Sequence, residues 1–181
     1  MRKTIVAALV AALTLALAIP ALGRSSKAAP VKGSDSIATI AGEAGFTELV
    51  GALMYVDAEL GTNLVGLFSE GTDQYTVFAP TNAAFQGLYS DLGVGGIEDL
   101  DAELVLDVLL YHVTEGRRAA NSVVPESGER TITSLMGAKF TVDSGLDIDD
   151  LADRDADIVS ANISASNGII HVIDDVILPL S

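Results

Sequence analysis

The sequence contains no cysteine and no tryptophan, and only two of its 181 residues are histidine. The absence of cysteine excludes a disulfide framework, and it excludes zinc and iron–sulfur sites that depend on cysteine thiolates. Basic residues are also scarce, since 10 lysines and arginines stand against 25 acidic residues and give a formal net charge of −15. This balance argues against nucleic acid as a partner, because phosphates require a basic surface.

Several catalytic motifs are missing as well. The chain has no Gly-x-Ser-x-Gly nucleophile elbow, and Ser134, Ser144 and Ser166 have no distinctive setting. The glycine-rich stretch 93–96 lacks the lysine and the spacing of a phosphate-binding loop. The apolar fraction is 49%, which is typical of a folded chain, and the length suits one domain.

The first residues follow the pattern of a secretory signal peptide. Arg2 and Lys3 precede an apolar run, Ile5–Ile19, and Pro20 is followed by small residues. We expect residues 1–23 to be a signal peptide that is cleaved after Gly23, and the alternative is an uncleaved membrane anchor. No cysteine follows the run, so we expect no lipoprotein anchor and no membrane insertion after cleavage. Residues 24–34 are small, polar and basic, which predicts a flexible linker before a single domain over 35–181.

Residues 35–181 change in pattern from helical to stranded. Apolar spacing predicts helices within 37–41, 46–54, 60–68, 82–88 and 102–112, with Ser36 or Asp35, Thr81 and Asp101 as N-caps. Helix 102–112 is apolar almost all round and is therefore predicted to be mostly buried. Short β-rich segments predict strands at 75–79, 130–134, 139–143, 157–161, 169–173 and 176–178. Helices first and clustered strands later indicate an α+β fold.

Three segments, taken in order, resemble the fasciclin domain family. They are Tyr75–Phe85, with Pro80, Thr81 and Asn82 at its centre; Leu109–Val113, with a Tyr-His pair; and Asn167–Pro179. The resemblance covers residues 36–179. It implies a β-wedge of two sheets packed with a group of helices. It also implies a secreted, non-catalytic module for adhesion or matrix contact.

The resemblance assigns two kinds of residue. Structural roles are expected for Pro80, Thr81, Asn82, Phe85, Asn167, Gly168, His171 and Pro179. In the family, the Tyr-His region is linked to integrin-type adhesion, so the candidate binding residues are Leu109, Leu110, Tyr111, His112 and Val113. A buried helix end accounts for the same five residues. A second adhesion motif of some animal members is not matched at 160–164, which lacks its charged residues.

The two histidines and one acidic run leave alternatives open. His112 and His171 could begin a metal site or act as a general base, but neither has a companion at ligand spacing, which favours hydrogen bonds to the backbone. The run Asp147–Asp157 could hold Ca²⁺, although it lacks the glycine of an EF-hand loop, and a solvated acidic loop is the preferred interpretation. Asn162 lies in an N-glycosylation triplet.

The sequence therefore predicts a secreted or envelope-associated interaction module that binds a cell-surface or matrix protein or glycan, with no cofactor and no metal. One alternative is an extracellular carrier of a small molecule or lipid, held between the helices and the wedge. The other is a secreted hydrolase.

Overall fold

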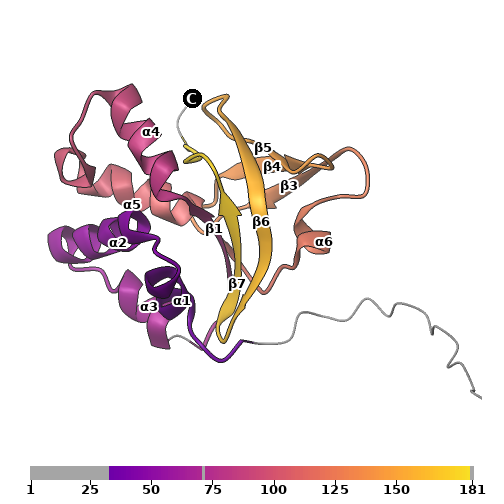
Figure 1. Ribbon diagram of the computed structural model, residues 1–181, viewed down its shortest axis with the longest axis horizontal. Coiled ribbons are helices and arrows are strands. Elements are labelled where there is room, and N and C mark those ends of the chain that lie inside the picture. The colour runs from indigo at the N-terminus through magenta and orange to yellow at the C-terminus, as the bar shows by residue number, and fades with distance from the viewer. Residues whose placement is uncertain (1–32, 71, 180–181) are drawn as a thin grey trace, which may run out of the picture.

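The computed structural model describes residues 33–70 and 72–179. The helices of residues 37–111 gather on one side of a bent sheet, whereas the short helix of residues 120–123 and the strands after it lie on the other side (Figure 1). The helices are α1 (Ile37–Glu43), α2 (Thr47–Leu60), α3 (Leu64–Glu70), α4 (Asn82–Leu92), the 3₁₀ turn η1 (Ile97–Asp99), α5 (Ala102–Tyr111) and α6 (Ala120–Val123). The strands are β1 (Tyr75–Pro80), β2 (Val113–Glu115), β3 (Glu129–Thr133), β4 (Lys139–Asp143), β5 (Asp147–Asp149), β6 (Asp155–Ala165) and β7 (Gly168–Ile173).

The described strands run in the order β2-β1-β7-β6-β5-β4-β3. Strand β6 belongs to both halves of this arrangement: residues 155–157 pair with β5, and residues 158–165 pair with β7. The register shifts twice along the second part, and such bulges bend a strand. Two sheets therefore meet along β6 as a wedge, with β3, β4 and β5 set at an angle to β1 and β7 (Figure 1). The predicted α+β class and two-sheet wedge are confirmed.

Two hydrophobic clusters explain why β1 and β7 are buried along their whole length. Val77 and Ala79 of β1 belong to the cluster under the helices, whereas Phe78 belongs to the cluster inside the wedge. Strand β7 divides in the same way, with Ile170 toward the helices and Ile173 toward the wedge. In the sequence, a strand that is buried on both faces appears as a continuous apolar run, and residues 75–79 and 169–173 have this pattern.

The predicted N-caps at Ser36, Thr81 and Asp101 are confirmed, since each side chain accepts a hydrogen bond from an amide of the first turn. Helix α2 ends at Gly61 in the left-handed conformation, which favours glycine. The predicted helix at 60–68 is therefore shorter, and α3 begins only at Leu64. Met54, predicted on the apolar face of its helix, is 60% exposed.

Two sequence predictions about the last part of the chain are wrong. Residues 176–178 form no strand, because their amides donate to side chains instead of a neighbouring strand: Val176 to Asp175, Ile177 to His112 and Leu178 to Asp150. The acidic run is not a solvated loop throughout. It contains β5 and the start of β6, and the carboxylate of Asp150 is buried, where it accepts amide hydrogen bonds.

The start of the described chain lies against the sheet. The amide of Gly33 donates to the carbonyl of Ala165 at 3.3 Å, and a side chain at position 33 would overlap the backbone of Ser164. The predicted signal peptide over 1–23 and all but the last two residues of the predicted linker over 24–34 lie outside the described residues. No helix within the described ranges is long and apolar enough to cross a bilayer.

Candidate functional site: an apolar groove between helices

The Pro-Thr-Asn segment fixes two helix starts. Pro80 ends β1, and the hydroxyl of Thr81 accepts from the amide of Ala84 at 3.2 Å to begin α4. Asn82 reaches across to α2: its Oδ1 accepts from the amide of Glu48 at 3.1 Å, and its Nδ2 donates to the carbonyl of Gly45 at 2.9 Å. Phe85 packs in the core of the helical side. The segment thus holds α4 against α2.

Asn167 and Gly168 hold helices in place at the other end of the helical layer. The buried Oδ1 of Asn167 accepts from the amide of Ile37 at 2.8 Å, and its Nδ2 donates to the carbonyl of Phe68 at 2.8 Å. Gly168 pairs with Tyr75, and an added Cβ there would overlap the carbonyl oxygen of Tyr75. These contacts tie α1 and α3 to the β6–β7 turn. Pro179, the last described residue, is half-buried.

His112 caps the end of α5 and is buried, with 2% of its surface exposed. Its Nδ1 lies 2.7 Å from the carbonyl of Val108, so this nitrogen carries the proton and donates. Its Nε2 accepts from the amide of Ile177 at 3.2 Å. Burial lowers the pKa of His112 to about 4, against the smaller opposing effect of the Val108 carbonyl. The imidazole is therefore neutral at pH 7.

His171 lies in β7 with its ring 5.6 Å from that of Phe78. Its Nε2 lies 2.9 Å from the carbonyl of Arg118 and donates to it, while its Nδ1 accepts from the amide of Asn162 at 3.4 Å. Burial lowers the pKa of His171 as well. Each of the four ring nitrogens in the two histidines has a backbone partner, so both side chains link segments of the fold.

The structure places most of the candidate binding residues inside the molecule. Tyr111 is fully buried, and its hydroxyl donates to the carbonyl of Lys139 at 2.9 Å. Burial, with a contribution from Asp150, raises the pKa of Tyr111 to about 12. Val113 is also buried, and Leu110 is half-buried. A partner has no access to Tyr111 in this conformation.

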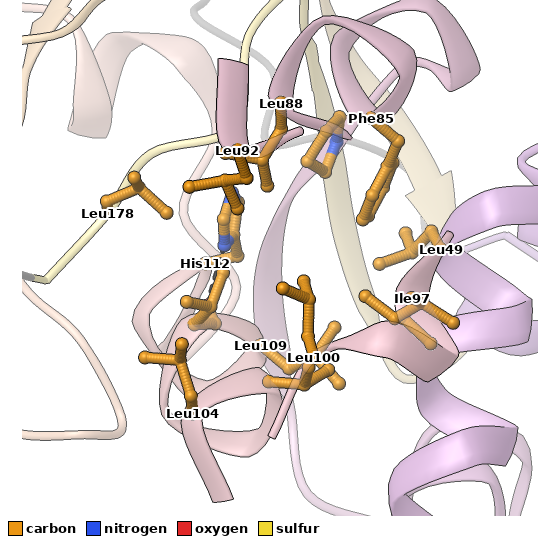
Figure 2. A pocket seen from close by; sticks show the side chains of 14 residues that line it. Leu49, Phe85, Leu88, Leu92, Ile97, Leu100, Leu104, Leu109, His112 and Leu178 are labelled. Atoms are coloured by element: carbon orange, nitrogen blue, oxygen red, sulfur yellow. Dashed lines mark hydrogen bonds between the residues drawn. The ribbon is translucent and has the colours of Figure 1, made fainter. Parts of the chain in front are cut away.

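Leu109 and His112, however, form part of the floor of a groove (Figure 2). The groove has a volume of about 80 Å³, and among the described residues that line it only His112 is polar. Its walls come from α2, the end of β1, α4, η1, α5 and the chain end. The lining residues are Leu49, Ala52, Pro80, Phe85, Leu88, Leu92, Ile97, Leu100, Leu104, Val105, Val108, Leu109, His112 and Leu178.

The groove explains an unexpected feature of α5. The sequence predicts a mostly buried helix, yet Leu104 and Val108 are only half-buried, because they face the groove and not a packed neighbour. Leu92 at the end of α4 forms a lip and is 51% exposed. The hydroxyl of Tyr55 holds the segment between η1 and α5 in place by donating to the carbonyl of Leu100 at 2.8 Å.

The chain end closes one side of the groove through Leu178. Asp150 accepts from the amide of Leu178 at 2.7 Å, and Arg154 binds Asp175 at 2.7 Å and Asp91 of α4 at 3.2 Å. A second, smaller hollow of about 30 Å³ lies between α1, α2, α3 and β1, and it shares Leu49, Leu109 and His112 with the groove. Both hollows thus border His112.

Sequence reasoning missed the outer walls of this groove, namely Leu92, Ile97, Leu100, Leu104 and Leu178. The one related signal is that helix 102–112 is apolar almost all round, which indicates a further apolar surface beside it but not which residues form that surface. No group of three or more histidine or acidic side chains within 33–70 and 72–179 is placed to hold a metal ion.

Comparison with known proteins agrees with the sequence motifs. The Fasciclin domain family model matches residues 44–179. The chain belongs to the fasciclin domain family. Among fasciclin relatives, protein sll1483 of Synechocystis is 35% identical over 92% of this chain and 87% of its own length.

Two mycobacterial relatives are longer than the region they share. The immunogenic protein MPB70 of Mycobacterium bovis is 37% identical over 65% of this chain, which spans 55% of that protein. The cell surface glycolipoprotein MPB83 of the same species is 35% identical over 65% of this chain and 48% of its own length. A solved FAS1 domain pair from the insect cell adhesion molecule fasciclin I gives a TM-score of 0.45 at 13% identity, covering 76% of this chain and 45% of the other.

Proposed function

We propose that this fasciclin protein is a non-catalytic interaction module that acts at the cell surface or outside the cell, where it binds a protein or glycan partner. The observation that carries the proposal is the chemistry of the groove. Its wall is hydrocarbon, and its imidazole is neutral with both nitrogens already bound to backbone groups. Such a site can bind an apolar group, but it has no side chain that is placed to donate or accept a proton in a reaction.

The place of action is supported by two features. The sequence predicts an export signal over residues 1–23, and MPB83 is named a cell surface protein. Residues 35–181 include 25 acidic and five basic residues, so the formal net charge of this part of the sequence is −20. A charge of this size favours solubility and repels anionic membranes.

The size of the groove gives less support to the carrier alternative. A cavity of about 150 Å³ is what holds one benzene molecule. The groove offers about 80 Å³, which is too little to enclose a lipid. It suits one apolar side chain whose backbone stays outside.

The test has two parts. Cells expressing the full chain are fractionated, and intact cells are treated with protease; the protein should appear in the medium or become digested at the surface. Beads coated with purified protein are then layered on host envelope preparations, and we expect retention well above that of beads coated with an unrelated acidic protein. Recovery in the cytosol, or equal retention of both kinds of bead, would contradict the proposal.

A panel of esterase and glycosidase substrates tests the hydrolase alternative. We expect turnover no faster than in buffer. Turnover that disappears in a His112→Ala variant with a wild-type circular dichroism spectrum would show instead that the imidazole is catalytic.

A further inference from the structure

The helical half of the molecule contains no positive side chain. Residues 33–116, which include α1 to α5 and the first two strands, have 14 aspartates and glutamates and no lysine or arginine. Glu98, Asp99 and Asp101 are exposed in and after η1, next to the groove residues Ile97 and Leu100. The groove is therefore an apolar site within a strongly negative surface.

The negative charge acts across this side of the molecule. Burial is the main cause that raises the pKa of both Tyr55 and Tyr89. Nearby carboxylates raise each of them further, with Glu59 the first of these for Tyr55 and Glu48, which accepts a hydrogen bond from the hydroxyl, the first for Tyr89. Tyr55 lies on α2 and Tyr89 on α4, so carboxylates lie close to both helices. Arg154, which approaches α4 from the wedge, pairs with Asp91 and Asp175, so within the helical half it offsets the charge of Asp91 but is not paired with Glu98, Asp99 or Asp101.

The volume and shape of the groove limit the apolar part of a ligand to one side chain. The groove volume of about 80 Å³ is larger than the volume that one water molecule needs but smaller than that of a cavity that holds one benzene molecule. Leu92, Leu104 and Leu178 remain partly exposed around the opening, so a side chain entering from solvent would bury apolar surface on both molecules.

We propose that the groove is the docking site for a cationic segment of a partner protein, in which one aliphatic side chain, such as that of leucine, lies between lysine or arginine residues. The apolar side chain fills the groove between α4 and α5, and the flanking cations face Glu98, Asp99 and Asp101. This inference rests on the proposed function and specifies its partner. Burial of an anchor side chain supplies affinity, and the opposite charges supply selectivity and a fast encounter.

The assay uses a heptapeptide with one central leucine between two Lys-Arg pairs and a fluorescent dye at its N-terminus. The peptide is titrated with the full-length protein. We expect saturable binding, seen as a rise in the fluorescence anisotropy of the dye. Raising the salt to about 0.5 M should weaken binding several-fold, since exposed charges are screened over a few ångströms at that ionic strength.

Two matched pairs of variants locate the site. Leu92→Ser removes the lip and should weaken binding about tenfold, the effect of losing about 1.4 kcal/mol. Met54→Ser removes an equally exposed apolar side chain elsewhere and should leave binding unchanged. Glu98→Gln should weaken binding about threefold, whereas Glu126→Gln, exposed beyond α6, should not. All four positions are exposed, so folding should be preserved.

The outcomes separate this inference from the broader function. A peptide with serine in place of leucine that binds equally well would overturn the docking site. Competition by a neutral apolar molecule, with no effect of Glu98→Gln, would also overturn it and favour a small-molecule site. Retention of Leu92→Ser beads on host envelopes at wild-type levels would reject the groove while leaving the interaction module in place.

Discussion

At the scale of single residues, the polar side chains of the family motifs stabilise the fold. His112, His171, Asn82 and Asn167 each satisfy backbone groups that no helix or strand reaches. Leaving such a buried group without its partner costs about 1–3 kcal/mol. These hydrogen bonds give the four side chains a structural role, and the groove offers a partner an apolar surface.

Acid should weaken the fold through His112. Its pKa is about 4 when folded and 6.5 when unfolded, so between these values the unfolded chain binds more protons and stability rises with pH. The contribution is complete above pH 6.5 and is lost as the pH falls toward 4. We expect urea unfolding to show about 2 kcal/mol less stability at pH 5 than at pH 7.5. His171, whose pKa is also lowered, acts in the same direction.

Because the chain has only two histidines, NMR can follow the titration of each imidazole separately. In the folded protein the His112 imidazole should not titrate above pH 6, and that of His171 should titrate below its usual value. A His112 signal that titrates near 6.5, or equal stability at both pH values, would show that the ring is accessible to water.

Asn167 should be among the residues least tolerant of change. Asn167→Asp keeps the acceptor for the amide of Ile37 but removes the donor to the carbonyl of Phe68 and introduces a charge at a buried site. We expect a loss of about 3 kcal/mol in urea unfolding. Asn121→Asp, at an exposed position, serves as the control and should change stability by less than about 0.5 kcal/mol.

At the scale of elements, strand β7 is the centre of the fold, since it pairs with β1 on one side and β6 on the other. Gly168 permits the close approach of β1. Gly168→Ala would push its Cβ into the carbonyl of Tyr75 and against Ile37, so we expect a loss of at least about 2 kcal/mol by thermal or urea unfolding.

A second glycine provides the matched control. Gly87 lies within α4, where an added Cβ meets nothing within 4 Å. Gly87→Ala should therefore stabilise the protein by about 1 kcal/mol, the difference in helix propensity. Equal effects of the two substitutions would mean that β1 and β7 are not in close contact.

Elements with strong local signals could be predicted from the sequence. Capped helices such as 82–92 and 102–111 and the buried strand 75–80 lie close to their predicted positions. The short strands 113–115 and 147–149 were missed, because three residues carry too little pattern. The false strand at 176–178 has a different cause: its β-branched residues fit a strand, but side chains distant in sequence bind its amides.

The groove could not be predicted, for a related reason. Its walls come from five helices or strands and from the chain end, and each wall residue looks like an ordinary core leucine or valine. Whether a leucine is buried or borders an opening depends on how α4, η1 and α5 pack. That packing depends on contacts such as those of Tyr55 with Leu100 and of Arg154 with Asp91. These residues are distant in sequence, so no local sequence pattern predicts the contacts.

At the scale of the whole molecule, charge divides the chain. All five basic residues of the segment 35–181 lie at Arg117 or beyond, while the helical half is only acidic. The remaining basic residues belong to residues 1–32.

If residues 1–23 are an export signal, N-terminal sequencing of protein from the medium or envelope should begin at or within a few residues of Arg24. A chain that retains Met1 in that fraction would favour the membrane-anchor alternative.

The central claim is that recognition takes place on the apolar groove of the helical half. Hydrogen exchange with mass spectrometry, on full-length protein free and bound to host envelope, tests it most directly. We predict added protection at residues 88–109, which include the end of α4, η1 and α5, and none at residues 129–157. Protection confined to 129–157, with 88–109 unchanged, would contradict the claim and place the binding surface on the wedge.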